Sequence, residues 1–287
     1  MAFVLIFAFL LSYSLLAFQE DFNIWIALSG SFVLALLGWM DDIEPLGVKV
    51  RLAVHSLVAL WAIFWVKDSL TDPDSLATAF ACVFFVFWIM WMINLYNFMD
   101  GIDGVAGSEA LVVLFFGGFI LLAGGDVPLA LLCLTLACAV GGFLVFNWPP
   151  AKIFMGDSGS CFLGYVLAVM AIVSNGRGTM PFAGWLILLA VFIVDATLTL
   201  VRRVLRTEEL FKAHRSHIYQ KAVIRGYSHK TVTLWITRIN VCLGMVLLIA
   251  LWQDMIIPAF MGVYLVMIIA WLALDRKLSP QEALSDD

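Results

Sequence analysis

The chain contains 287 residues, of which 63% are hydrophobic and 13% are charged, and its mean hydropathy is +1.03. This composition excludes an ordinary soluble domain, in which about 45–50% of the residues are apolar. The formal net charge of −5 argues against nucleic acid as a partner, because nucleic-acid-binding domains are strongly basic. We therefore predict an all-α polytopic membrane protein, embedded in a lipid bilayer.

Ten stretches have the length of a transmembrane helix, which needs about 20 mainly apolar residues, with a range of about 17 to 25. They are residues 2–18, 23–40, 51–66, 77–96, 107–123, 128–146, 160–174, 182–200, 232–252 and 255–274. The first stretch has no basic n-region and no small-residue cleavage site, so we predict a span there rather than a signal peptide. The sequence thus predicts a single membrane domain, residues 1–287, formed by a bundle of about ten transmembrane helices.

Basic residues are concentrated on one side of this predicted bundle. The connections after spans two, four, six and eight, together with the C-terminal tail, hold 13 of the 16 Lys and Arg residues. The positive-inside rule identifies that side as cytoplasmic. Residues 201–231, the most basic connection, are therefore predicted to form a cytoplasmic loop.

Acidic residues gather on the same side, where long apolar runs end. Three clusters follow spans two, four and six: Asp41-Asp42, Asn97-x-x-Asp100-x-x-Asp103 and Asp157. A charged side chain costs about 2.5 to 3.5 kcal/mol at the centre of a membrane helix, so carboxylates retained beside the bilayer indicate a function. We expect the three clusters to form one active site on the cytoplasmic face, which holds a divalent metal against phosphate.

The Asp41-Asp42 pair follows Gly38-Trp39-Met40. Adjacent carboxylates repel each other unless a cation or a proton compensates, so the pair suits metal binding or proton transfer. A solvated helix end is the alternative interpretation. Lys49 and Arg51 follow closely in the sequence, and we expect them to hold the phosphate of an anionic lipid.

The second cluster contains two Asp-Gly steps, which allow the backbone to turn tightly. Asn97, Asp100 and Asp103 are three residues apart and would spread over about a third of a helix circumference if the turn is helical. Hard oxygen ligands suit Mg²⁺, which keeps waters and phosphate oxygens as its remaining ligands. The alternative is a purely structural turn.

Asp157 lies where the seventh span begins, within Lys152-Ile-Phe-Met-Gly-Asp-Ser-Gly-Ser160. It fits a helix N-cap, for which Ser158 and Ser160 compete. It also fits a helix N-terminus that presents N–H groups to an anion. From the residues alone, the two interpretations are equally good.

Two histidines flank an arginine in the basic connection, in the string His214-Arg215-Ser216-His217. These side chains can donate hydrogen bonds to a diphosphate, although most of the basic charge there needs no reason beyond topology. Asp195 lies inside the eighth span. We expect it to pair with Arg202, with Arg203 or with another helix, and we assign it no catalytic role.

Four motifs in this order on this topology are Gly-x-x-Asp-Asp, Asn-x-x-Asp-Gly-x-Asp-Gly, Phe-Met-Gly-Asp-Ser-Gly-Ser and His-x-x-His. Together, from about Trp39 to Tyr227, they resemble the polyprenyl-phosphate N-acetylhexosamine-1-phosphate transferases, which include MraY-type and WecA-type enzymes. The resemblance implies that a UDP-N-acetylated sugar donates its sugar-1-phosphate to undecaprenyl phosphate, with release of UMP. Such a reaction starts the synthesis of a lipid-linked glycan at the bacterial inner membrane. That glycan would be either an O-antigen of lipopolysaccharide or a cell-wall polymer.

The resemblance also implies roles for individual residues. In such enzymes Asp157 binds Mg²⁺, for which Mn²⁺ is an alternative, and Asn97 and Asp100 shape the same metal centre. Asp103 lies toward the nucleoside, and the uracil is contacted by Asn147 and Phe154. The implied catalytic residues are Asp41, Asp42, Asp100, Asp157, His214 and His217. The implied substrate-binding residues are Lys49, Arg51, Asn97, Asp103, Asn147, Phe154 and Arg215.

Two departures from the family pattern affect these expectations. The string His217-Ile-Tyr-Gln220 lacks the further histidines of the MraY and WecA types, and it looks closer to WbpL-like O-antigen initiating enzymes, which use a modified N-acetylated sugar. The chain also begins at what resembles the family's second span, so we expect either a truncated N-terminus or a misassigned start codon. A homodimer is one option for the assembly.

Two other classes of function stay open on the sequence. An intramembrane Mg²⁺-dependent prenyltransferase would also use Asp-rich motifs on a diphosphate, although with a different spacing and with no need for the basic histidine loop. An ion-coupled secondary transporter would use membrane carboxylates, but near the bilayer midplane and often in repeated halves.

Overall fold

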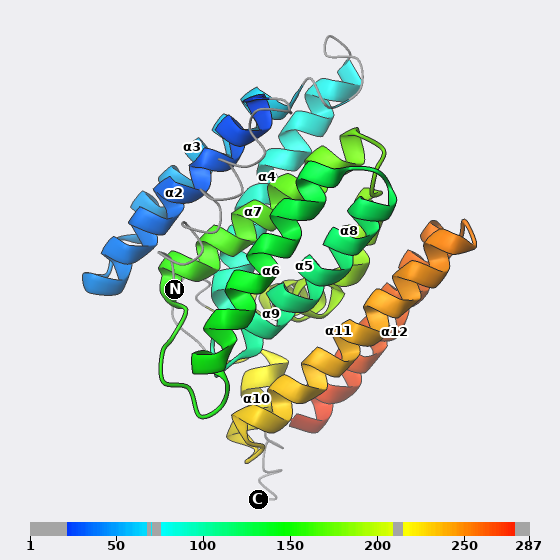
Figure 1. The fold of residues 1–287 in the computed structure, drawn as a ribbon. Helices are drawn as coiled ribbons and strands as arrows, with labels where there is room; N and C mark the ends of the chain where they lie inside the picture. Colours follow the sequence, from blue (N-terminus) through cyan, green and yellow to red (C-terminus); the bar gives the residue numbers. More distant parts are fainter. Residues whose placement is uncertain (1–21, 68–69, 71–75, 209–214, 279–287) are drawn as a thin grey trace, which may run out of the picture.

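The computed structural model describes residues 22–67, 70, 76–208 and 215–278. The predicted span 2–18 and the predicted site residue His214 lie outside these residues. The helices are α2 (Phe22–Ile43), α3 (Val48–Val66), α4 (Leu76–Met99), α5 (Val105–Ala123), α6 (Val127–Asn147), α7 (Gly156–Gly176), α8 (Phe182–Leu188), α9 (Ala190–Leu205), α10 (Ile218–Ile224), α11 (His229–Trp252) and α12 (Ile256–Leu278). Within the described ranges the chain is an all-α bundle (Figure 1).

Eight of these helices are long and apolar enough to cross a membrane, and α8 with α9 forms a ninth candidate span that is bent by 78°. Each of the predicted spans from the second to the tenth thus corresponds to a helix or to this broken pair. The protein is a multi-pass membrane protein. The third and seventh spans, which look short in the sequence, are helices of 19 and 21 residues.

The core of the bundle is α7, which is buried along nearly its whole length and packs against α2 and α4. Small residues permit this close approach. A Cβ added to Gly38 of α2 would overlap the backbone of Asp157 and Ser158, and one added to Gly164 of α7 would overlap the carbonyl of Met92 in α4. In contrast, α12 lies at the edge of the bundle, with most of its surface unburied.

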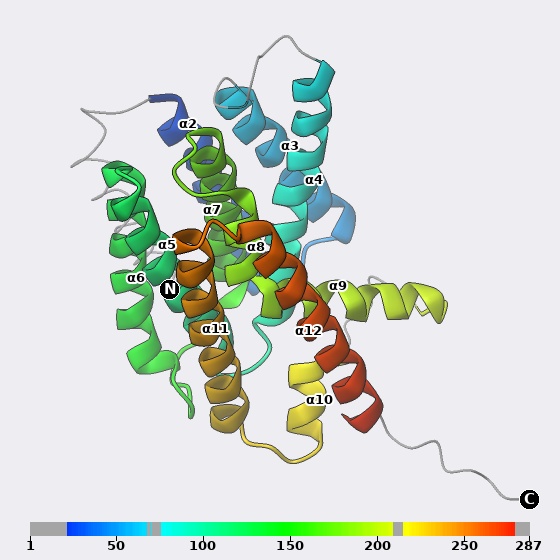
Figure 2. The ribbon, with the colours of Figure 1, turned by 90° about the vertical axis from the view of Figure 1, so that its right-hand side faces the viewer.

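The eighth predicted span was expected to be one helix over 182–200, and that expectation is wrong. The chain leaves helical geometry at Leu189 (φ −95°, ψ 7°), and α9 then runs across the bundle, above α10 in Figure 2. Asp195, Thr199 and Arg203 are four residues apart on α9 and all are buried. Polar groups require hydrogen-bonding partners when water is excluded, and the bend places Asp195 against α10 and α12.

Candidate functional site

Arg51, in the first turn of α3, connects two of the predicted acidic clusters. Its Nη1 lies 2.8 Å from Asp41 Oδ2 and 3.6 Å from Asp157 Oδ2. The carboxyl groups of Asp41 and Asp157 are also within hydrogen-bonding reach of each other. Two carboxylates this close repel each other, and Arg51 supplies the compensating positive charge.

Asp42 contacts the same site through the backbone of Asp157. Its Oδ1 accepts a hydrogen bond of 3.0 Å from the backbone N–H of Asp157. The preceding residue, Gly156, has φ +69°, and a Cβ added there would lie 2.6 Å from Asp42 Oδ2. Gly156 is therefore required both by its backbone conformation and by the carboxylate packed against it.

Asn97 connects the last turn of α4 to α7. Its Nδ2 donates a 2.7 Å hydrogen bond to Asp157 Oδ1, and it lies 3.4 Å from Ser160 Oγ. Asp157 thus receives one partner from α3, one from α4 and a close carboxylate from α2. The structure brings together the residues at the ends of three helices that the sequence predicted to form one site.

Asp100 follows α4 directly and is mostly buried in the wall of this site. Burial raises the pKa of its carboxyl well above the usual value, and the negative charges of Asp157 and Asp42 raise it further. The backbone N–H of Gly156 acts in the opposite direction by hydrogen bonding to the carboxylate. Ionisation of Asp100 would therefore leave the site with more negative charge than Arg51 compensates, which is the condition under which a bound cation is stabilising.

Asp103 lies at the other end of the same loop. Its Oδ1 is 3.2 Å from His229 Nδ1, and its Oδ2 accepts a 3.1 Å hydrogen bond from the backbone N–H of Ala151. Thr233 Oγ1 donates to the Asp103 carbonyl at 2.8 Å. The first two turns of α11 are thereby attached to the loop between α4 and α5.

Asn147 closes the site from α6 and is almost fully buried. Its Oδ1 accepts from Gly104 N–H at 3.0 Å and its Nδ2 donates to the Ile153 carbonyl at 2.8 Å. The amide is therefore engaged with the protein itself, and a contact between Asn147 and uracil stays a prediction. Phe154, by contrast, is 73% exposed.

These residues surround a pocket of about 360 Å³. It is lined by Asn97, Asp100, Gly101, Ile102, Asp103, Asn147, Phe154, Gly156, Asp157 and His229. Six residues assigned to substrate binding or catalysis from the sequence, Phe154 among them, thus line one cavity. Its volume lies within the range of small-molecule sites, about 300 to 1,000 Å³.

His229 is the pocket residue that the sequence analysis missed. It is the first residue of α11, after the N-cap Ser228. A single histidine at the start of an apolar helix carries no motif of its own. The signal that could have found it is its place in the sequence, in the first turn of a span in the same way as Asp157.

His217 and Arg215 do not line this pocket. His217 is buried, its Nδ1 lies 3.9 Å from Asp195 Oδ1, and its ring stacks beside Phe98. Burial lowers the pKa of His217. The charge of Asp195 raises this pKa, whereas the charges of Arg202 and Arg203 lower it. The structure thus places His217 beside Phe98, a residue of the second acidic cluster, and outside the pocket.

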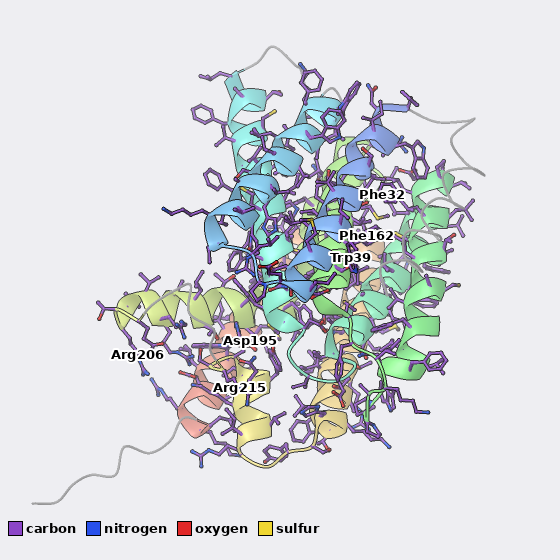
Figure 3. All side chains as sticks on the ribbon, turned by 90° about the vertical axis from the view of Figure 1, so that its left-hand side faces the viewer. Phe32, Trp39, Phe162, Asp195, Arg206 and Arg215 are labelled. Carbon is purple, nitrogen blue, oxygen red and sulfur yellow. The ribbon has the colours of Figure 1, made fainter. Side chains whose placement is uncertain are left out.

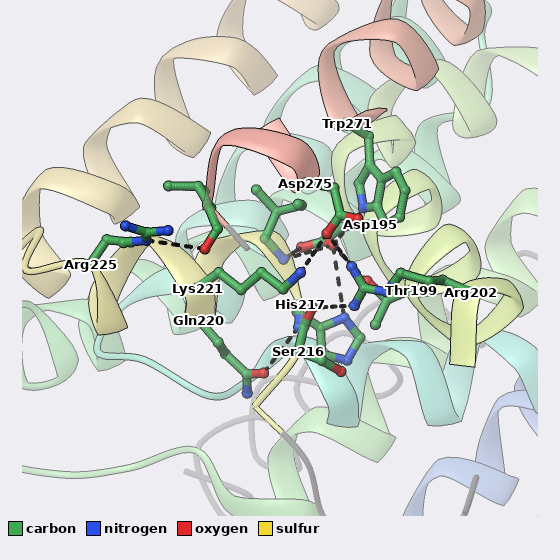
Figure 4. A network of polar contacts seen from close by, with 12 residues as sticks. Asp195, Thr199, Arg202, Ser216, His217, Gln220, Lys221, Arg225, Trp271 and Asp275 are labelled. Atoms are coloured by element: carbon green, nitrogen blue, oxygen red, sulfur yellow. Dashed lines mark hydrogen bonds and ion pairs between the residues drawn. The ribbon is translucent and has the colours of Figure 1, made fainter. Parts of the chain in front are cut away.

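The prediction that Asp195 pairs with Arg202, with Arg203 or with another helix is confirmed in its last alternative, because its partners come from α10 and α12. Asp195 accepts hydrogen bonds from the backbone N–H of Ile218 at 3.0 Å and from Trp271 Nε1 at 3.0 Å (Figure 4). Arg202 instead contacts Asp275 and donates to the Ser216 carbonyl. The physical reason is that α9 ends beside α10 and α12, whose groups are closer.

The other basic residues expected in the site lie apart from the pocket. Lys49 is exposed at the start of α3, and Arg215 lines a different cavity, between α10 and α12. Figure 3 shows Arg215 beyond Asp195 and away from the bundle core. Their predicted roles in holding phosphate stay predictions.

The residues around Asp157 fit a magnesium ion by their chemistry. The cluster supplies carboxylate and amide oxygens, which are hard ligands, and the raised pKa of Asp100 reflects an ionised form that no cation compensates. Among the described residues, no three His, Cys, Asp or Glu side chains converge closely enough to hold an ion by themselves. Mg²⁺ usually takes one or two carboxylates and completes its shell with substrate phosphates and water.

The comparisons with known proteins agree with this arrangement. Residues 24–175 match glycosyl transferase family 4. The chain is 30% identical over 214 residues to a probable undecaprenyl-phosphate N-acetylglucosaminyl 1-phosphate transferase of Bacillus subtilis, which covers 71% of this chain and 60% of that protein.

Two further relatives match shorter segments. A decaprenyl-phosphate N-acetylglucosaminephosphotransferase of Mycobacterium tuberculosis is 33% identical over 139 residues, or 43% of this chain and 34% of that protein. A phospho-N-acetylmuramoyl-pentapeptide-transferase of Chlorobium luteolum is 36% identical over 104 residues, or 31% of this chain and 27% of that protein. The matches thus span 60% or less of these relatives. Because the family match covers more than half of the chain and includes three of the four motifs, the chain belongs to glycosyl transferase family 4, in the superfamily of MraY- and WecA-type transferases.

Proposed function

We propose that this protein transfers an N-acetylhexosamine-1-phosphate from a UDP-sugar to undecaprenyl phosphate, with release of UMP. The observation that carries the proposal is the convergence of Asp41, Asp42, Asn97 and Asp157 from three helix ends beside one pocket. The relatives' names support the same reaction class. Two of them name a polyprenyl phosphate and the transfer of an N-acetylglucosamine phosphate, and the third names the transfer of a phospho-N-acetylmuramoyl-pentapeptide. We place the reaction on the cytoplasmic face of the bacterial plasma membrane, where the basic residues lie.

The reaction is a displacement at phosphorus. An oxygen of the lipid phosphate forms a bond to the β-phosphorus of the UDP-sugar, the bond between that phosphorus and the bridging oxygen breaks, and UMP leaves with the bond's electron pair. The second pKa of a phosphate monoester is about 6, so the lipid phosphate is mostly ionised at neutral pH and needs no protein base. Direct attack, without a phospho-enzyme, is therefore the simpler route.

Side chains of this site would supply positioning and charge. Asp157, Asn97 and Asp100 would hold Mg²⁺, which when bound offsets negative charge on the diphosphate. Phe154 offers an exposed ring at the pocket for stacking on the uracil. Arg51, placed between Asp41 and Asp157, lies where an incoming lipid phosphate would find a positive charge.

The test is magnesium-dependent UMP release from a panel of UDP-sugars by the purified full chain with undecaprenyl phosphate. We expect Asp157→Asn to reduce the rate at least 100-fold, the order of loss on removal of an electrostatic group that acts in the transition state. Asp254→Asn is the matched control, because Asp254 lies in the turn between α11 and α12, remote from the pocket. Full activity of Asp157→Asn would refute the assignment. Release of diphosphate from a prenyl diphosphate supplied with an aromatic acceptor, with no UMP from any UDP-sugar, would indicate prenyl transfer, and vesicle uptake without UMP would indicate transport.

A further inference from the structure

A second pocket, of about 880 Å³, lies where α10 approaches the end of α12. Its walls carry five basic side chains and two apolar ones: Arg215, Lys221, Arg225, Arg276 and Lys277, with Ile224 and Leu278. No Asp or Glu is among its described lining residues, and it shares no residue with the carboxylate pocket. It is therefore a separate cationic cavity, which we call the basic pocket.

An apolar groove of about 310 Å³ adjoins the basic pocket. It runs between α9, α10, α11 and α12, and its walls include Trp235, Met267, Trp271 and Leu274. Lys277 and Leu278 line both cavities. A charged cavity that opens into an apolar one matches a ligand with an anionic head and a hydrocarbon chain.

The position of both cavities relative to the bilayer favours a lipid as that ligand. α12 is a candidate membrane span with most of its surface unburied by protein, so hydrocarbon chains surround it. Arg276 and Lys277 are exposed in its last turn, the level at which basic residues meet phosphate groups of the cytoplasmic leaflet.

Part of the positive charge in the basic pocket is already compensated. Asp275 pairs with Lys221 at 2.5 Å and contacts Arg202, and Arg225 Nε donates to the Leu278 carbonyl. These contacts fix the geometry of the wall. Because none of the lining residues that the structure describes is acidic, the remaining cations give the cavity a net attraction for phosphate.

We propose that the basic pocket and the apolar groove together bind an anionic phospholipid of the bilayer, with its phosphate in the pocket and an acyl chain along the groove. A bulk phospholipid is favoured over the lipid substrate because a phosphate held here lies apart from Asp157 and its partners. The inference rests on charge and shape, and it is independent of the reaction proposed above.

The experiment measures lipid binding to the purified full chain by native mass spectrometry, with phosphatidylglycerol, phosphatidylcholine and undecaprenyl phosphate titrated separately. The test variant is the double substitution Arg276→Gln/Lys277→Gln. Each basic residue near an anionic lipid surface contributes about a fivefold factor in affinity, so we expect phosphatidylglycerol affinity to fall about 30-fold. Phosphatidylcholine affinity should be unchanged.

The matched control is Arg206→Gln/Lys230→Gln, which removes two exposed charges from the same membrane face outside the pocket. This control should retain the phosphatidylglycerol affinity of the unmodified protein. Equal loss in the control and the test variant would overturn the proposal, because it would show general attraction to the membrane surface. Loss of undecaprenyl phosphate alone, with phosphatidylglycerol binding intact, would also overturn it, and would assign the cavity to the substrate.

Discussion

Asp42 Oδ1 accepts a 3.0 Å hydrogen bond from the backbone N–H of Asp157, which joins the end of α2 to the first turn of α7. The N-terminus of a helix carries partial positive charge and unpaired N–H groups, so a carboxylate is stabilised there. In this protein a side chain from another helix takes that place. The contact fixes where the Asp157 side chain begins, and hence where its carboxylate lies relative to Arg51 and Asn97.

Replacement of Gly156 by alanine tests how much the site depends on this contact. The left-handed conformation at φ +69° costs an L-residue about 1–2 kcal/mol. The new Cβ would in addition lie 2.6 Å from Asp42 Oδ2. We expect Gly156→Ala to lower both thermal stability and transferase activity, with the activity loss at least tenfold.

Gly178→Ala is the matched control for that variant. Gly178 has the same φ of +69°, and a Cβ there would meet no atom within 4 Å. The control should show the backbone cost alone, as a small fall in melting temperature with activity retained. If both variants behave alike in melting and activity measurements, the Asp42 contact does not shape the site.

Asp100→Asn should separate stability from activity. The pKa of Asp100 is raised by burial and by the charges of Asp157 and Asp42, so an ionised Asp100 destabilises the metal-free protein. A neutral amide of the same shape should raise the melting temperature of the protein without Mg²⁺. Addition of Mg²⁺ should then raise the melting temperature less than it does in the unmodified protein. The variant should release no UMP. Such a trade of stability for function is common at charged sites.

The contrasting substitution is Asp126→Asn. Asp126 caps α6 and pairs with Arg177 at 2.9 Å, with no neighbouring carboxylate among its hydrogen-bonding partners. Its neutralisation should lower the melting temperature and leave UMP release intact. A fall in stability for Asp100→Asn as well would show that the charges around Asp100 are already compensated.

The spans and the acidic clusters could be predicted because each has a local signal. Long apolar runs bounded by Gly, Pro or Asp mark helices, and carboxylates at their ends stand out by their cost in a bilayer. The positive-inside rule then placed Asp42, Asp100 and Asp157 on one side. That single topological step predicted their convergence.

The break at Leu189, the helix α10 and the role of His229 could not be predicted because their causes are tertiary. No Gly, Pro or charged residue stands at Leu189 to mark the bend, and the partners of Asp195 beyond it come from α10 and α12. His217 fits a functional motif in the sequence, yet its burial beside Asp195 is set by the docking of α10. The partner of His229 is 126 residues away.

Tyr219→Phe tests whether α10 supports the second acidic cluster. Tyr219 Oη donates a 2.9 Å hydrogen bond to the Phe98 carbonyl, between Asn97 and Asp100 in the sequence. A Cβ added to Gly101 would overlap the same hydroxyl. Loss of this bond should lower the free energy of unfolding by about 1 kcal/mol and reduce activity by loosening the loop.

Tyr264→Phe is the control for that effect. Tyr264 Oη donates to the Leu186 carbonyl at 3.1 Å, a bond of the same type remote from the pocket. Its loss should cost a similar free energy of unfolding with no change in activity. Equal activity in the two variants would mean that α10 does not position the cluster.

His229 gives the most direct test of the pocket's far wall. Its Nδ1 lies 3.2 Å from Asp103 Oδ1, and it lines the cavity opposite Asp157. His229→Phe keeps a planar ring and removes Nδ1, which faces Asp103 Oδ1 and also accepts a 3.4 Å hydrogen bond from the Asp103 backbone N–H, so Asp103 loses a partner and the loop that carries Asp100 loses an anchor to α11. We expect the KM for the UDP-sugar to rise about tenfold, a cost near 1.4 kcal/mol that is within the range of a hydrogen bond to a charged group. His229→Asn can place a polar amide group near the position of Nδ1, where it can bond to Asp103, and should recover most of that loss. If the asparagine variant binds the donor as poorly as the phenylalanine variant, the ring itself contacts the substrate. An unchanged KM in both would exclude His229 from the donor site, since the contact with Asp103 would then have no effect on binding.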